Sequence, residues 1–555
     1  MKSFSQNSSI EWAGKIGGNY NDGLLDLHID SSGNLLTTGY FQVNADLDFG
    51  TGGYTLTGVS GFDAFVAKYN NDGNILWGVK FAGTLDSFGF RINSDSQGNV
   101  YSAGKFFNTI DFNPGPGVYN LTATVGPYAI SDIYISKLDS NGNFVYAKKI
   151  GGLGVKDISD LKVDDLGNTY ITGYFNKQTF FSDSVSLIPF VGQDTIYDTF
   201  IAKYDTDGNL IWVKQIGSGS ILQRSESLAI DSLGNLLVLG TFHEVTDFNP
   251  DSIETHILSP HLQGATDIYI LKLDSSGNFI WVKNIWGNAS NSAKSITLDT
   301  DDNLLMTGFF SGTVDFDPSS NTYLLTCPPN SGYNPFILKL SSSGDFIWAK
   351  HLIGNGEGKG ITVSPNGNIG ITGRFNNTCD FSLGNGTAVN TTIGNSDIFI
   401  AEYSNSGDFN WVKCIGGTQD DIGLDIVSNH EGTYYSIANF FGNCYSYNSS
   451  DNLNLVATGY QDAMLLKISQ NSLNSYSFNQ NTFTVFPNPA QDKLFIELPK
   501  SFDEFQISVF SISGQLVLRT YSKTEINIDE LSSGVYFIEV TNNSSDRFFK
   551  KIVKL

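Results

Sequence analysis

Sulfur and charge are scarce in this sequence. Charged residues make up only 16% of the 555 residues, and there are only four cysteines and three methionines. The cysteines show no metal-ligand spacing, which argues against a structural zinc site. An oxidising compartment would allow one or two disulfides, and three pairings are open among Cys327, Cys379, Cys414 and Cys444.

Long apolar runs and helical periodicity are also missing. No run of 18 apolar residues occurs, so we expect no transmembrane segment. No sustained 3.6-residue periodicity occurs, which argues against a sizeable helical domain. The sequence has no nucleophile elbow, phosphate loop, zinc signature or dinucleotide fingerprint. It therefore gives no positive indication of an enzyme, although carboxylates converging from different repeats stay open.

Basic residues are few relative to acidic ones. The chain has 32 Lys+Arg against 56 Asp+Glu, a net charge of −24. Residues 484–555 carry 8 and 9 of these, so a net charge of −23 lies in residues 1–483. Such a surface repels phosphate backbones and anionic lipid, so nucleic-acid and direct membrane partners are disfavoured. Divalent cations or basic partners fit this charge, as does simple solubility.

A repeat of about 65 residues dominates what is present. The segment FDAFVAKYNNDGNILWGVKFAG (62–83) recurs as SDIYISKLDSNGNFVYAKKIGG, YDTFIAKYDTDGNLIWVKQIGS and TDIYILKLDSSGNFIWVKNIWG. Each copy reads as a hairpin with a Gly-Asn or Gly-Asp turn. An aromatic residue marks each of seven copies: Trp12, Trp77, Tyr146, Trp212, Trp281, Trp348 and Trp411.

A second strand pair completes each unit. It lies around GNLLTTGYF (33–41), with counterparts such as GNVYSAGKF, GNTYITGYF and the divergent GTYYSIANF, in which Asn439 takes the place of the usual glycine. An Asp-Phe pair follows in most units: Asp48-Phe49, Asp111-Phe112, Asp247-Phe248, Asp315-Phe316 and Asp380-Phe381. Four short strands per unit predict one antiparallel blade of a propeller.

The two ends of the repeat array complement each other. The chain begins with IEWAGKIGG, a Trp strand without its partner, and the last apolar strand, QDAMLLKIS (461–469), has no strand after it. We expect the N-terminal strand to complete the last blade and close the ring, which removes exposed sheet edges. The prediction is an all-β, seven-bladed β-propeller over 10–468, with an N-terminal segment at 1–9 and a linker at 469–483.

In its sequence pattern, the array resembles the bacterial β-propeller-repeat proteins whose units carry a D…F…K…D…G…W pattern. The resemblance covers about residues 10–468. It implies the propeller and a surface or extracellular setting, but no single activity.

Residues 484–555 read as alternating strands with Gly and Asn turns, which predicts a small Ig-like β-sandwich. This segment resembles the C-terminal sorting domain (type A) of cargo for the type IX secretion system of Bacteroidetes. The matching residues are Pro487, Asn488, Pro489, Ala490, Gly514, Gly534, Val535, Tyr536, Lys550 and Lys551. Phe486 stands where many members have Tyr.

The resemblance implies the type IX machinery as a partner and a secreted or outer-membrane, cell-surface location. It also implies cleavage of the domain and frequent attachment to surface polysaccharide. Such cargo carries a signal peptide, whereas MKSFSQNSSIEW at the start lacks its apolar core. We expect the natural start to lie upstream; the alternative is a relic domain on a protein that stays inside the cell.

Features present in every unit are predicted to be scaffold rather than site. Asp63 and Lys68 recur as Asp132/Lys137, Asp198/Lys203, Asp267/Lys272 and Asp462/Lys467. The stretch Asp205–Asn209 resembles the start of a calcium loop but lacks the acidic twelfth residue, so a plain turn is expected and calcium is the alternative. No other cofactor is expected. Scattered surface positions are predicted for the histidines His28, His243, His256, His261, His351 and His430.

Departures from the repeat are the places where a binding site is expected. Units two and four carry long inserts at 113–131 and 243–266, and the last unit carries Phe440, Phe441 and Cys444. Because loops on a rigid scaffold often bind ligands, we expect a glycan or an extracellular protein at the propeller face shaped by these inserts, including the loop 249–262. The predicted function is a secreted binding or adhesion protein; the alternatives are a polysaccharide-degrading enzyme and a structural surface component.

Overall fold

The computed structural model places the chain in two compact units, residues 1–470 and 471–555, which are treated separately below. The described residues are 7–49, 53–126, 131–191, 196–217, 223–251, 254–262, 264–448, 451–471, 483–498, 505–511, 515–542 and 547–555. Within these ranges, no helix is long and apolar enough to cross a membrane.

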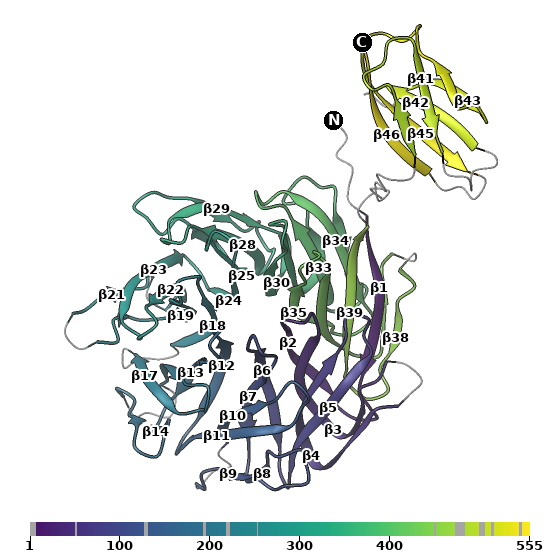
Figure 1. The fold of residues 1–555 in the computed structure, drawn as a ribbon. Helices are drawn as coiled ribbons and strands as arrows, with labels where there is room; N and C mark the ends of the chain where they lie inside the picture. The colour runs from purple at the N-terminus through teal and green to yellow at the C-terminus, as the bar shows by residue number, and fades with distance from the viewer. Residues whose placement is uncertain are drawn as a thin grey trace. The chain divides into compact units, whose positions relative to one another are not determined.

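A set of four antiparallel strands recurs through the first unit (Figure 1). The first two sets are β2 (Gly23–Ile29), β3 (Leu35–Asp46), β4 (Thr55–Tyr69) and β5 (Ile75–Gly83), then β6 (Ser87–Ser94), β7 (Val100–Phe106), β10 (Asp132–Leu138) and β11 (Phe144–Gly152). The next two are β12 (Lys156–Val163), β13 (Thr169–Phe175), β16 (Asp198–Tyr204) and β17 (Leu210–Ile216), then β18 (Arg224–Ile230), β19 (Leu236–Phe242), β22 (Asp267–Leu273) and β23 (Phe279–Gly287).

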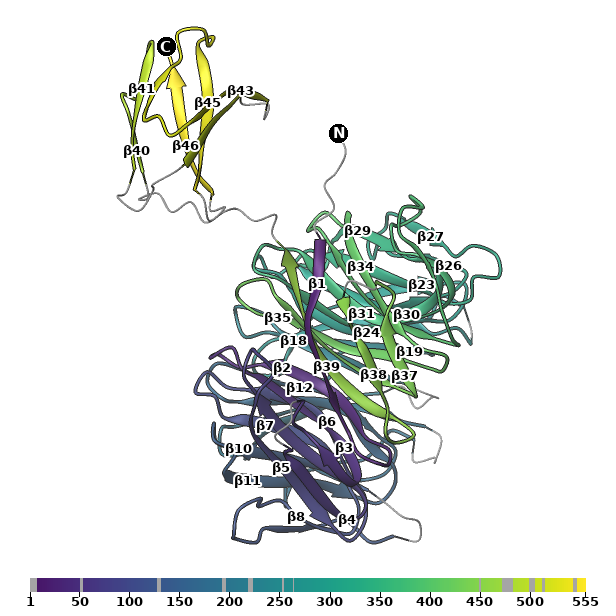
Figure 2. The ribbon, with the colours of Figure 1, turned by 90° about the vertical axis from the view of Figure 1, so that its right-hand side faces the viewer.

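The remaining sets follow the same order. They are β24 (Asn291–Leu298), β25 (Leu304–Phe310), β28 (Asn334–Leu340) and β29 (Phe346–His351), then β30 (Ile353–Val363), β31 (Ile369–Asp380), β33 (Asp397–Tyr403) and β34 (Phe409–Gly416). The last set joins β35 (Ile422–Ser428), β36 (Tyr434–Phe440) and β39 (Asp462–Asn471) to β1 (Asn7–Ile16), which comes from the start of the chain and pairs with β39 (Figure 2).

The first strands of successive sets contact one another around a common axis (Figure 1). The contacts run in the order β2, β6, β12, β18, β24, β30 and β35, and β35 in turn contacts β2. Hydrophobic clusters fill the layers between neighbouring sheets. The fold is therefore all-β and β-propeller-like, with the predicted burial of both strand faces.

Short strands between the second and third strand of a set extend the sheet of the preceding set. They are β8 (Thr109–Asp111), β9 (Asn120–Thr122), β14 (Thr179–Phe180), β15 (Ser186–Leu187), β20 (Thr246–Asp247), β21 (Ile257–Leu258), β26 (Thr313–Asp315), β27 (Leu324–Thr326), β37 (Asn443–Ser446) and β38 (Asn454–Val456). For example, β8 pairs with the outer strand β5. The β20–β21 hairpin meets the end of β17 through a Gly217–Asp247 bridge. The short strand β32 (Val389–Thr391) instead pairs with the end of β31 in its own set.

The aromatic mark of one set packs on the turn glycine of the next. Gly142 has φ of 83°, and a Cβ on it would lie 3.0 Å from the ring of Trp77. Trp77 Nε1 also donates a hydrogen bond of 3.1 Å to the carbonyl oxygen of Ser140 in the same turn. Left-handed backbone and close approach both require glycine here, which explains why Trp and Gly recur together.

In the first repeat, the position of the Asp-Phe pair is taken by Asp46-Leu47, two residues earlier than predicted. Asp46 Oδ1 accepts the N–H groups of Asp48 and Tyr54, as Asp111 does in the second repeat. Leu47 is fully buried at the place that Phe112 takes. The run Asp-Leu-Asp-Phe offers two registers, and the hydrogen bonds select Asp46-Leu47, so the assignment to Asp48-Phe49 was wrong.

The second unit contains two antiparallel sheets. One consists of β40 (Thr484–Phe486), β41 (Lys493–Glu497) and β44 (Glu525–Asn527), and the other of β42 (Phe505–Ser511), β43 (Leu516–Tyr521), β45 (Gly534–Asn542) and β46 (Arg547–Lys554). A shared cluster of buried residues, which includes Leu494, Ile507 and Ile538, joins them.

Candidate functional site

One position in the repeat varies although its neighbours do not. The second strand of each set ends in Gly-x-Phe or a close relative, and the middle residues are Tyr40, Lys105, Tyr174, Thr241, Phe309, Arg374 and Asn439. A Cβ on Gly104 would lie 1.8 Å from the carbonyl oxygen of Phe88, and Phe106 is fully buried. Glycine and phenylalanine therefore serve the fold, and the middle residue is left to differ. The sequence carried this signal, which our prediction missed.

The last repeat aligns differently from the prediction. Ala438 pairs with Gly423, as Gly39 pairs with Leu24 in the first repeat. Ala438 therefore replaces the usual glycine, and Asn439 is the variable residue, so the earlier assignment to Asn439 was wrong. Asn439 Oδ1 accepts the N–H of Leu24 at 3.0 Å, and Asn439 Nδ2 donates to the carbonyl oxygen of Leu24 at 3.2 Å.

A β-bulge brings a second variable residue to the axis. Each first strand has a register shift that leaves one residue unpaired: Leu25, Phe90, Ser159, Glu226, Lys294, Lys359 and Leu424. Bulges bend a strand and re-aim a side chain. These residues are half-buried, and they lie on the first strands, which surround the common axis.

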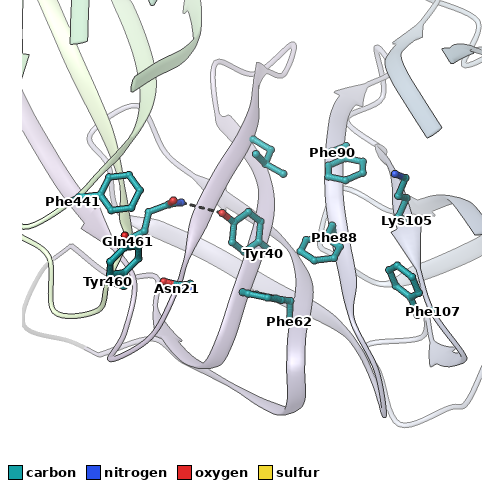
Figure 3. Close-up of a pocket in the computed structure, with 11 residues that line it drawn as sticks. Asn21, Tyr40, Phe62, Phe88, Phe90, Lys105, Phe107, Phe441, Tyr460 and Gln461 are labelled. Atoms are coloured by element: carbon teal, nitrogen blue, oxygen red, sulfur yellow. Dashed lines mark hydrogen bonds between the residues drawn. The ribbon is translucent and has the colours of Figure 1, made fainter. Parts of the chain in front are cut away.

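These two kinds of position meet in an aromatic pocket between β2, β6 and the last repeat. Its volume is about 490 Å³, and Figure 3 shows its lining. The lining residues are Asn21, Leu25, Tyr40, Phe62, Phe88, Phe90, Lys105, Phe107, Phe441, Tyr460 and Gln461. Tyr40, Phe62 and Phe88 form a cluster with ring centroids 5.4 to 5.5 Å apart. Of the divergent residues predicted in the last repeat, Phe441 lies in this pocket, whereas Phe440 and Cys444 belong to the core.

The pocket also has polar groups that are free to bind. Gln461 Nε2 donates to the hydroxyl oxygen of Tyr40 at 3.0 Å (Figure 3). Burial raises the pKa of Tyr40, so this hydroxyl keeps its proton and can donate it to a ligand. Asn21 Oδ1 is buried and accepts no hydrogen bond from the described residues. The pocket therefore combines aromatic ring faces with a hydroxyl and an unused amide oxygen.

A polar path leads from the pocket across the next set of strands. Lys105 lies 5.7 Å over the ring of Phe90 and forms an ion pair with Asp157. Asp157 Oδ2 also accepts a hydrogen bond of 3.1 Å from the hydroxyl of Tyr174. Side chains from β6, β7, β12 and β13 thus form one row of contacts.

Among the carboxylates on the first strands, Asp26, Asp160 and Asp425 lie at the contacts between neighbouring sets. Asp26 accepts the N–H of Ile92 at 2.6 Å, and Asp160 accepts that of Leu228 at 2.7 Å. Asp425 lies near Asp26, and burial followed by this neighbouring charge raises its pKa. Because Asp26 and Asp160 occupy matching positions and bond the next set, they serve as inter-sheet links.

The recurring third-strand aspartate and lysine are part of the scaffold, but within a set they do not form an ion pair with each other. The third-strand lysine meets the turn aspartate of its own set, with Lys272 Nζ 2.9 Å from Asp231 Oδ2. The third-strand aspartate instead accepts backbone hydrogen bonds, as Asp267 does from His261 and Gly287.

The calcium-like stretch is one of the recurring turns. Asp205 Oδ1 accepts the N–H groups of Asp207 and Asn209 at 3.0 and 2.8 Å. Asp30, Asp95 and Asp231 make equivalent turns.

The histidines serve several packing roles. His256 and His261 stack on Phe279 and Trp286, each with ring centroids 3.9 Å apart. His28 and His351 are half-buried, and burial lowers the pKa of each to about 4, so neither is a freely exposed surface residue.

All four cysteines are buried free thiols, so the disulfides that an oxidising compartment would allow are not formed. They lie in three different hydrophobic clusters: Cys327 in one, Cys379 and Cys414 in a second, and Cys444 in a third. Burial raises the pKa of Cys327 to about 11. Sequence spacing could not reveal that separate cores enclose these side chains.

None of the described residues of the two long inserts lines the aromatic pocket. The β8–β9 hairpin of the 113–131 insert adds to the outer edge of the preceding sheet. Its residues Tyr119 and Leu121 instead line a second hollow of about 840 Å³, together with Phe180. The predicted role of the 249–262 loop in shaping the binding face is not supported by the position of the aromatic pocket.

In the second unit, the motif residues gather around the final strand. Asn488 bonds the backbone of Lys551 and of Val553, both at 2.9 Å. Ala490 accepts the N–H of Leu555 at 2.8 Å and donates to Val553. The cis bonds of Pro487 and Pro489 flank Asn488.

The other motif residues extend this arrangement. Gly534, Val535 and Tyr536 pair with β46, and Lys550 Nζ donates to the carbonyl oxygen of Phe483 at 2.7 Å. Gly514 lies outside the described residues.

Comparison with known proteins identifies the tail. Residues 484–555 match the family described as the secretion system C-terminal sorting domain. A tail of this family supports export through a type IX secretion system, and hence a secreted or cell-surface location.

The repeats resemble an uncharacterized WD repeat-containing protein of Acanthamoeba polyphaga mimivirus, with 23% identity over 504 residues. The match covers 78% of this chain but only 36% of the relative's length.

Similar solved structures include a Bacteroides caccae protein of unknown function (10% identity, TM-score 0.31, covering 63% of this chain and 89% of that one). Streptogramin B lyase is 13% identical with a TM-score of 0.28, covering 69% and 93%. An extracellular domain assigned to a one-component system of B. thetaiotaomicron is 10% identical with a TM-score of 0.19, covering 98% and 99%.

Proposed function

We propose that this protein is type IX cargo of a Bacteroidetes-like cell and acts outside the cell as a non-catalytic glycan-binding or adhesion protein. The repeats would form a closed seven-bladed β-propeller, and the tail an Ig-like sandwich that is read by the secretion machinery. The cyclic contacts of the first strands and the pairing of β1 with β39 support a closed ring.

The aromatic pocket carries the glycan proposal. Sugar rings present apolar C–H faces and hydroxyl groups, so a sugar site needs aromatic faces beside hydrogen-bonding groups. Tyr40, Phe62 and Phe88 supply the faces, while Asn21 Oδ1 and the Tyr40 hydroxyl supply an acceptor and a donor. A purely apolar ligand would leave the buried Asn21 oxygen unpaired, which is unfavourable.

The enzyme alternative needs a pair of carboxylates free for catalysis. Asp26 and Asp160 are instead engaged by backbone N–H groups of the next set. We therefore favour binding over turnover.

A polysaccharide screen with the full chain tests this proposal. We expect selective binding without release of reducing ends. The double variant Tyr40→Ala/Phe88→Ala should weaken binding by at least about tenfold, as the loss of stacking and burial implies. Phe180→Ala, which removes an aromatic ring from the second hollow, is the matched control and should bind as the wild type does. Polysaccharide turnover, or binding lost only in Phe180→Ala, would refute the proposal.

A further inference from the structure

Arginine is confined to one part of the repeats. Residues 1–483 contain three arginines, Arg91, Arg224 and Arg374, and all lie on the first or second strand of their sets. Two of them are occupied: Arg91 donates to the carbonyl oxygens of Phe90 and Ser159, and Arg374 forms an ion pair of 2.8 Å with Glu357.

Arg224 is held differently. Its guanidinium lies 4.7 Å from the ring centroid of Tyr174 and 5.7 Å from that of Tyr197. Its Nε is buried without a hydrogen-bond partner, and no carboxylate of the described residues forms an ion pair with it. The guanidinium thus lies beside two tyrosine rings that are inclined at 85° to each other, and its charge has no ion-pair partner among the described residues.

Glu244 and Asp157 lie in the wider surroundings of Arg224, but neither forms an ion pair with it. Burial, and then the Arg224 charge, lower the pKa of His243, so this imidazole is neutral near pH 7. On the same strand, Glu226 is already paired with Lys294 at 2.8 Å. The charge of Arg224 is therefore available to a ligand.

Arg224 is connected to the aromatic pocket through contacts already described. Tyr174, on which it lies, bonds Asp157, and Asp157 pairs with the pocket residue Lys105. We take this row of contacts as the route by which a chain of sugars that enters the pocket would reach Arg224.

We propose that the ligand is an acidic polysaccharide, and that Arg224 binds a uronate carboxylate while neighbouring sugar rings stack in the pocket. This inference rests on the proposed function. The planar guanidinium fork fits a carboxylate with two hydrogen bonds, and the contacts of Arg224 with the two tyrosine rings use none of its N–H groups in an ion pair. A carboxylate would also supply the acceptor that the buried Nε lacks.

The test compares polygalacturonate with the same polymer after reduction of its carboxyl groups. The full chain should bind polygalacturonate at least about tenfold more tightly, since one charge-assisted contact gives that factor. Arg224→Gln should bind the two polymers equally, at the level of the reduced polymer. Arg374→Gln, which removes an arginine already paired with Glu357, should keep the preference.

Each outcome bears on a different step. Binding of both polymers with equal affinity by the wild type, or an unchanged preference in Arg224→Gln, would refute the uronate inference and leave glycan binding in place. Failure to bind any polysaccharide would refute glycan binding as well. A preference lost equally in Arg374→Gln would show general charge attraction and overturn the role of Arg224.

Discussion

The junctions between sheets give a prediction about pH. The third-strand aspartate of one set faces the start of the next first strand, and the residue there differs from set to set. At one junction Lys156 Nζ lies 2.8 Å from Asp132, with both side chains fully buried. At another, Asp421 takes the same place, and its pKa rises to about 7 through burial and, less strongly, through Asp397. Asp22 is raised to about 7 in the same way, with Asp462 nearby.

The sign follows from proton linkage. An unfolded aspartate has a pKa of about 3.9, so between about pH 4 and 7 the folded state binds more protons than the unfolded state. The free energy of unfolding therefore falls as pH rises through this window. Each pH unit costs about 1.4 kcal/mol per group, or about 4 kcal/mol over the whole shift of Asp421.

The test uses Asp421→Asn, which cannot ionise. The half-buried histidines, such as His28 with its pKa near 4, act in the opposite sense below pH 6.5, so the quantity to measure is variant minus wild type. This difference should rise by about 1.4 kcal/mol per pH unit between pH 5 and 7. Urea titration followed by tryptophan fluorescence reports the repeats alone, because all seven tryptophans precede residue 412.

Ser87→Ala at the matching position of another junction is the control. Ser87 Oγ accepts the N–H of Ala64 at 2.8 Å, so its removal should destabilise equally at every pH. A pH-independent difference for Asp421→Asn would refute the reasoning about the carboxylate pair.

Further predictions concern the scaffold, the thiols and the tail. Gly142→Ala should cost about 2 kcal/mol, more than Gly33→Ala, because both have positive φ but only Gly142 faces a tryptophan ring; equal costs in urea titration would contradict the interlock. Lys272→Met should cost about 3 kcal/mol by leaving Asp231 buried and unpaired, and adding Asp231→Asn should recover part of the loss; a further loss would argue against the ion pair. The native protein should not react with a thiol reagent, whereas the urea-unfolded, unreduced protein should titrate four thiols; fewer than four would indicate a disulfide. Asn488→Ala should lower secretion in a type IX host by loosening the end of β46, with Lys493→Ala as an exposed control; undiminished secretion would contradict that role.

Local pattern predicted the repeated elements well. The Gly-Asn hairpins and the aromatic marks follow from turn chemistry and strand propensity within about 20 residues, so one sequence suffices to find them. The scaffold nature of the recurring Asp/Lys residues could also be inferred, although Lys272 pairs with Asp231 rather than with Asp267. Such partners are decided by the pairing of strands, and the sequence spacing between the partners does not reveal that pairing.

The pocket could not be predicted in this way. Tyr40 and Gln461 are hydrogen-bonded although they are 421 residues apart in the sequence, and only the contact between the first and last repeats brings them together. The bulges that expose Leu25 and Phe90 depend on register between strands, which repeat spacing does not report. The prediction placed the site on the long inserts, and the first of these lies at the outer edge of a sheet. The pocket is instead lined by variable residues that follow the recurring glycines.

The central claim is that the ligand binds in the aromatic pocket. Hydroxyl-radical footprinting of the full chain, with and without the polysaccharide that binds most tightly in the screen, tests it directly. We predict protection of Tyr40, Phe88 and Tyr460, with Tyr119 and Phe180 in the second hollow unchanged. Protection of Tyr119 and Phe180, with the aromatic pocket unchanged, would contradict the account.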